Sequence, residues 1–132
     1  MERLQNDLFD LGADLATPDS PDLKFTPLRI QESQVLRLEA EIDQLNERLS
    51  PLTSFILPGG SMLIAQAHVC RSLARSAERR CQHLNALEPL AGVGLAYINR
   101  LSDLLFVAAR LIARRQGIAE ILWQPAAKPA EK

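Results

Sequence analysis

A Pro-Gly-Gly turn at residues 58–60 constrains the fold most strongly, because it separates an apolar run from a long helical pattern. Proline cannot continue a regular element, and glycine adopts backbone angles that other residues avoid. Ser61 follows directly, where its hydroxyl can accept a hydrogen bond from an amide of the first helical turn. The sequence therefore predicts a long helix over residues 61–87, preceded by the apolar segment 55–57.

This predicted helix has one charged face and one apolar face. Three arginines recur every four residues and a glutamate lies seven residues after the first, so at about 100° per residue they share one stripe. These residues are Arg71, Arg75, Arg79 and Glu78. The opposite side carries apolar residues at three- and four-residue spacing, a face typical of a helical core. Its members are Leu63, Cys70, Leu73, Ala74, Ala77, Cys81 and Leu84.

Two interpretations of the arginine stripe remain open from spacing alone. The first is a solvated helix face on which Arg75 and Glu78 pair at i,i+3, a contact that adds little stability. The second is an anion site, because a guanidinium fork matches a phosphate group and the glycine turn allows a ligand to approach the backbone closely.

Composition indicates a single all-α domain. The 132 residues suffice for one core, and 47% of them are hydrophobic while only 5% are aromatic, which favours helix packing over a β-sandwich. We expect an up-and-down helix bundle over residues 1–124 and a disordered tail over residues 125–132, which is rich in Ala, Pro and Lys. The net charge of −1 gives no global attraction for nucleic acid or an anionic membrane.

The cysteines and histidines predict neither a disulfide nor a metal site. Cys70 and Cys81 lie eleven residues apart on one predicted helix, too far to bridge, so we expect reduced core thiols. His68 and His83 are isolated and should be surface or satisfied core residues. No leader-like segment or membrane span is evident in the sequence, and we expect a cytoplasmic protein.

Three further helices follow from the apolar periodicity. They are expected over residues 1–16, 29–49 and 95–116, with Gly117 as a helix end and no sheet of consequence. The first has no capping residue before it and resembles the continuation of a longer segment. On the last helix, a second stripe is either a surface face or part of a site. It contains Asn99, Asp103, Phe106 and Arg110.

Four blocks of the sequence resemble the PduO-type ATP:cob(I)alamin adenosyltransferases, also called corrinoid adenosyltransferases. They cover most of the chain in the family's order. The blocks are 8–18 (LFDLGADLATP), 29–30 (RI) with 38–43 (LEAEID), 55–61 (FILPGGS) with 68–80 (HVCRSLARSAERR), and 97–110 (YINRLSDLLFVAAR).

The resemblance implies a homotrimeric helix bundle that binds ATP, cobalamin and Mg2+ between subunits and moves the 5′-deoxyadenosyl group of ATP onto cobalt. Arg71 and Arg75 then resemble the arginines near the triphosphate. Glu78 resembles a carboxylate associated with ATP or magnesium, and Asn99 resembles an ATP contact. Phe55 resembles the aromatic residue that closes the lower face of the corrin and keeps the axial ligand away.

The sequence departs from the family pattern in two places. Ser76 stands where the family usually has a second arginine beside Arg75. The family also begins with a phosphate-binding loop and a first helix that this sequence lacks, so we expect the chain as given to turn over far more slowly than one extended by them. Two other hypotheses are a non-catalytic paralogue that binds corrinoid or forms oligomers, and a plain helical interaction module.

Overall fold

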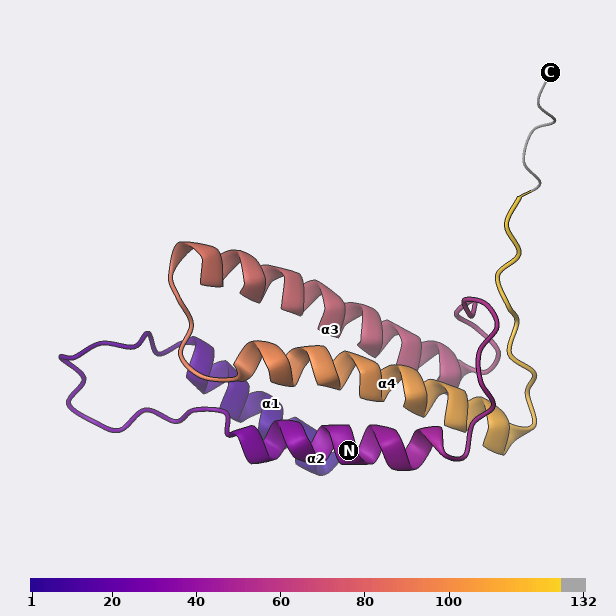
Figure 1. Cartoon of the computed structure of the whole chain (residues 1–132), viewed down its shortest axis with the longest axis horizontal. Helices are drawn as coiled ribbons and strands as arrows, with labels where there is room; N and C mark the ends of the chain where they lie inside the picture. The colour runs from indigo at the N-terminus through magenta and orange to yellow at the C-terminus, as the bar shows by residue number, and fades with distance from the viewer. Residues whose placement is uncertain (127–132) are drawn as a thin grey trace, which may run out of the picture.

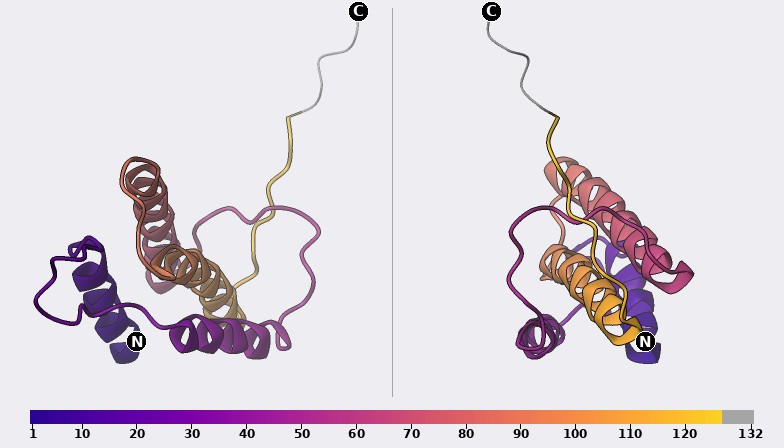
Figure 2. Two further views of the ribbon diagram at one scale, coloured as in Figure 1. Left: turned by 60° about the vertical axis from the view of Figure 1, so that its left-hand side comes forward. Right: turned by 90° about the vertical axis from the view of Figure 1, so that its right-hand side faces the viewer.

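The protein, seen in a computed structural model that describes residues 1–126, folds into four α-helices joined by loops. They are α1 (Glu2–Leu15), α2 (Glu32–Asn46), α3 (Met62–Leu87) and α4 (Gly94–Gln116). The other three helices surround α4 (Figures 1 and 2), which confirms the predicted all-α bundle. Residues 1–126 form no other helix, and none of these four is both long and apolar enough to cross a bilayer. The tail expected to be disordered lies mostly outside the described residues.

The helix ends follow local capping groups. Ser61 caps α3 as predicted, because its Oγ accepts a hydrogen bond from the Ile64 amide at 3.3 Å. Gly117 ends α4 in the left-handed conformation, with a φ of 66°. The second helix begins at Glu32 rather than at Arg29, since the Gln31 amide donates to Gln34 Oε1 at 2.8 Å and starts the helix there.

The buried apolar core lies between α1, α2 and α4. Leu38 of α2 and Tyr97 of α4 are fully buried in it. The remaining core residues come from the same helices and from the loop before α2: Leu4, Leu11, Ile30, Val35, Ile98, Leu101 and Leu104. Because α4 contributes more residues to this core than either of the other two helices, its sequence is apolar around more of its circumference than the sequences of its neighbours.

The predicted core face of α3 is wrong in part. Leu73 is 64% exposed, Cys70 is exposed and Cys81 is only partly buried, so the two free thiols are not core residues. α3 packs on α4 through a different face, which includes Ile64, His68 and Glu78. The leucine-rich face instead borders an apolar groove of about 420 Å³ between α1, α3 and α4.

A buried polar network ties α1 to α2 and α4. Asp7 of α1 accepts hydrogen bonds from Tyr97 Oη at 2.8 Å and Gln34 Nε2 at 2.9 Å, and it pairs with Arg37. Burial alone would raise the pKa of Asp7, but the hydrogen bonds from Gln34, Tyr97 and Arg37 together lower it below its ordinary value of 3.8. The same burial and the Asp7 carboxylate raise the pKa of the Tyr97 hydroxyl.

This network predicts a pH-dependent contribution to stability. A carboxyl whose pKa is lower in the folded state stabilises the fold above its unfolded pKa and loses that effect as the pH falls through the folded pKa. Replacing Asp7 with asparagine should therefore lower the free energy of unfolding at pH 7 more than at pH 3, as measured by urea denaturation. Asp19→Asn, on an exposed loop, is the matched control and should have little effect at either pH. An equal loss for Asp7→Asn at both pH values would contradict this role.

Candidate functional site

Three of the residues singled out in the sequence meet between α3 and α4. The side chain of Glu78 on α3 is buried, with 5% of the residue exposed. Its Oε2 accepts a hydrogen bond from Arg75 Nη1 at 2.6 Å, and its Oε1 accepts one from Asn99 Nδ2 of α4 at 2.9 Å. Arg75 and Glu78 of the α3 stripe and Asn99 of the α4 stripe therefore form one cluster.

The cluster forms because α3 turns its charged stripe toward α4. The Arg75 and Glu78 pair is the i,i+3 contact expected from their spacing. It is more than a surface pair, since Glu78 is enclosed while the Arg75 side chain is 46% exposed. Gln82 Nε2 also donates to Glu78 Oε1, at 3.5 Å. One carboxylate thus holds three donors, and part of the Arg75 guanidinium still reaches solvent.

Arg71 lies one turn earlier on α3 and faces an aromatic ring of α4. Its guanidinium carbon is 4.9 Å from the centroid of the Phe106 ring, which is a cation–π contact. His68 meets the same ring edge to face, with centroids 6.4 Å apart. Phe106 of α4 therefore contacts two side chains of α3, Arg71 and His68.

The remaining arginine of the stripe lies away from this cluster. Arg79 is exposed and donates from Nη2 to Ser76 Oγ at 3.0 Å. Ser76 therefore accepts a hydrogen bond from Arg79 and carries no charge of its own.

Phe55 lies on a separate segment, in the loop between α2 and α3. The Leu57 amide donates to the Ile121 carbonyl at 2.8 Å, and the Trp123 amide donates to the Phe55 carbonyl at 2.6 Å. These bonds pair residues 55–57 with residues 121–123 around an antiparallel bridge. The Phe55 residue is 78% exposed and meets the Trp123 ring edge to face at 6.1 Å between centroids.

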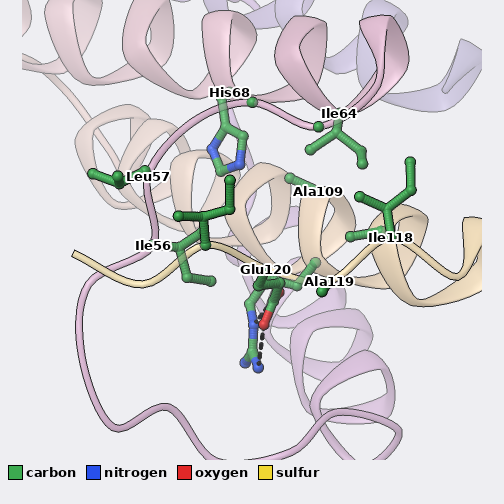
Figure 3. Close-up of a pocket in the computed structure, with 13 residues that line it drawn as sticks. Ile56, Leu57, Ile64, His68, Ala109, Ile118, Ala119 and Glu120 are labelled. Atoms are coloured by element: carbon green, nitrogen blue, oxygen red, sulfur yellow. Dashed lines mark hydrogen bonds and ion pairs between the residues drawn. The ribbon is translucent and has the colours of Figure 1, made fainter. Parts of the chain in front are cut away.

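A small apolar pocket of about 20 Å³ lies beneath these paired segments. Figure 3 shows His68 pointing from α3 toward Ile56, with Ala109 of α4 beside it. Burial lowers the pKa of His68, the nearby Arg71 lowers it further, and Glu120 opposes both. The pKa of His68 thus lies below its ordinary value, which favours the neutral imidazole. The apolar segment 55–57 packs partly on the bundle here.

An ion pair anchors the paired segments to α4. The Arg110 guanidinium donates to Glu120 Oε1 at 2.9 Å and to the Ser50 carbonyl at 2.7 Å (dashed to Glu120 in Figure 3). Arg110 is buried, so the surface interpretation of its stripe is wrong at this position. Arg110 thus links Glu120 in the segment after α4 to Ser50 in the loop after α2.

The sequence interpretation did not single out the roles of His68, Phe106 and Trp123. His68 is three residues before Arg71 and shares its helix face, so the spacing carried that signal. Trp123 is placed beside Phe55 by the pairing of two segments far apart in the chain, which no local pattern reveals.

Comparisons with known proteins find relatives of this chain. Residues 1–112 match the family model described as cobalamin adenosyltransferase. The corrinoid adenosyltransferase of Mycobacterium tuberculosis (strain H37Rv) is 46% identical over 128 residues, covering 95% of this chain and 64% of that protein. The human corrinoid adenosyltransferase is 37% identical over 127 residues, covering 93% of this chain and 50% of that protein.

A solved structure shows the same fold. It is a phenylalanine-to-alanine variant of the PduO-type ATP:corrinoid adenosyltransferase from Lactobacillus reuteri, complexed with cobalamin and ATP. It superposes with a TM-score of 0.87 at 36% identity, covering 94% of this chain and 68% of that one. The chain thus spans about 64% of the length of its mycobacterial relative and half that of its human relative.

Proposed function

Because the chain belongs to the cobalamin adenosyltransferase family, we propose that it transfers the 5′-deoxyadenosyl group of ATP to the cobalt of cob(I)alamin. In this reaction the cobalt(I) electron pair forms a bond to the 5′ carbon, the carbon–oxygen bond breaks, and its electron pair leaves with triphosphate. The substrate itself supplies the nucleophile, so the protein has only to position the reactants and stabilise the leaving charge.

The Glu78 cluster is the observation that carries this proposal. Charge collects on the triphosphate as the carbon–oxygen bond breaks, and donors already aimed at that charge stabilise it most. Arg75 is held by Glu78 and remains 46% exposed, which suits a guanidinium that binds phosphate. Arg71 contributes a second charge, and Asn99 contacts ATP from α4.

Magnesium fits this site as a companion of ATP. Within residues 1–126, no group of three or more His, Cys, Asp or Glu side chains is placed to hold a metal ion. Both oxygens of Glu78 already accept hydrogen bonds, from Arg75 and Asn99. Mg2+ is commonly bound through substrate phosphates with one or two carboxylates at most. Glu78 would therefore orient Arg75, and the phosphates would hold the ion.

Phe55 is proposed to cover the lower face of the corrin ring. Its side chain is among the most exposed apolar groups of the chain and is available to a flat apolar ligand. A phenyl ring in that place would keep the lower axial ligand from the cobalt, as the family resemblance implies.

A homotrimer with sites between subunits is the proposed assembly. The groove bordered by Leu8, Leu73 and Leu105 exposes apolar side chains of α1, α3 and α4, which an intersubunit contact would bury. Light scattering at micromolar concentration measures the mass, and a folded monomer would remove the intersubunit site.

An anaerobic assay tests the reaction itself. The chain is mixed with chemically reduced cob(I)alamin, ATP and Mg2+, and formation of adenosylcobalamin is followed by its absorbance. We expect ATP-dependent conversion that stops when ATP is omitted. Saturable binding of both substrates without any conversion would contradict the enzyme and favour a non-catalytic corrinoid-binding protein.

A further inference from the structure

Phe55, the exposed residue proposed to cover the corrin, is held by Trp123, which lies outside that site. Phe55 lies on the loop between α2 and α3, and the contacts that restrain it come from residues after α4. The Trp123 amide bonds to the Phe55 carbonyl, Ser54 Oγ donates to the Trp123 carbonyl at 2.9 Å, and the two rings meet at an interplanar angle of 68°.

A line of contacts connects Phe55 to the bundle. Buried Arg110 binds Glu120, three residues before Trp123. Trp123 is itself 46% exposed, so its ring is not explained by burial in the core. Among residues 1–126, Phe55 supplies the aromatic ring that Trp123 contacts edge to face.

From this geometry we propose that Trp123 is a positioning residue, which fixes the Phe55 ring in the orientation that covers the lower face of the corrin. The inference rests on the proposed function. A phenyl ring on an exposed loop would otherwise sample several rotamers, and ordering it during binding costs conformational entropy. The tryptophan edge and the flanking backbone hydrogen bonds remove that cost before the substrate arrives.

The test compares two corrinoids on Trp123→Ala, Trp123→Phe and a neighbouring control, Gln124→Ala. Both corrinoids are supplied in the cobalt(II) state and reduced in the assay by a dihydroflavin, because cobalt(II) of cobalamin holds the lower axial base whereas cob(I)alamin has already released it. Cobinamide lacks the base, so only cobalamin needs Phe55 to keep the base from the cobalt before reduction. Trp123→Ala should lower the rate with cobalamin about threefold to tenfold, the scale of one aromatic pair, and leave the rate with cobinamide near wild type. Trp123→Phe keeps an aromatic edge and should recover most of the loss.

A merely structural role for Trp123 predicts a different result. Loss of folding would lower the rates with cobalamin and with cobinamide equally. Equal losses with the two corrinoids would overturn the inference, and so would no loss with either. Circular dichroism checks the helix content, and Trp123→Phe supplies the comparison if the alanine variant unfolds. Gln124 is exposed beside Trp123, and its replacement should change neither rate.

Binding supplies a readout that does not depend on turnover. Trp123 is the sole tryptophan of the chain, so its fluorescence reports directly on this position. Titration with cobalamin should quench it saturably in the wild type, and more weakly in Phe55→Ala. Absence of saturable quenching would overturn the placement of the Phe55–Trp123 pair next to the bound corrin. Saturable quenching without turnover would contradict the proposed reaction but keep the Phe55–Trp123 pair next to the bound corrin.

Discussion

Replacing Glu78 with alanine is expected to lower kcat/KM for adenosyl transfer by about a hundredfold, the usual effect of losing one preorganised donor. The Glu78 carboxylate holds both Arg75 and Asn99, so alanine removes the acceptor that fixes these two donors. Donors that are free to move must be ordered during the reaction, which raises the barrier. The anaerobic absorbance assay measures the rate, and the expectation rests on the proposed function.

Two variants control for charge and for folding. Glu78→Gln keeps the shape and one acceptor oxygen but loses the charge, so its rate should lie between those of the wild type and Glu78→Ala. Glu88→Ala, at the exposed end of the same helix, should leave the rate unchanged. A folded Glu78→Ala protein that works within about twofold of the wild type would show that the cluster is not preorganised for catalysis.

Most of the fold could be predicted from the sequence because its signals are local. The ends of α3 and α4 depend on Ser61 and Gly117, whose capping preferences act within a single turn. The apolar spacing of residues such as Leu38 likewise identifies the helices that form the core.

The packing face of α3 could not be predicted in the same way. Leu73 and Ile64 lie on different sides of this helix, and both sides offer apolar groups to a neighbour. Which side packs depends on where α4 lies, and α4 contacts the side of Ile64 and Glu78. Local periodicity does not determine that choice, because it describes one helix at a time.

In the candidate site, too, contacts within one helix could be predicted from the sequence and contacts between distant segments could not. Arg75 and Glu78 were related by helical spacing, and the structure brings Asn99 to them across the contact between α3 and α4. The placement of Trp123 beside Phe55 depends on pairing between segments more than sixty residues apart, for which no local signal exists. The functional roles of these residues remain predictions that the variants test.

The affinity of arginine variants for ATP depends on the same cluster. Arg71→Ala and Arg75→Ala should each weaken ATP binding by about 1.5 to 3 kcal/mol, the range for a hydrogen bond to a charged group, or roughly tenfold to 150-fold in Kd. Arg79→Ala is the matched control on the same helix, and it should change Kd little because Arg79 is exposed and donates to Ser76.

Titration calorimetry with ATP on the wild type and these three variants, each checked for helix content, tests the assignment of the triphosphate site most directly. The assignment predicts a large loss of affinity for Arg71→Ala and Arg75→Ala and a Kd near wild type for Arg79→Ala. Unchanged affinity in the first two, or an equal loss in all three, would contradict it and would make the arginine stripe a structural helix face held by the Arg75–Glu78 pair.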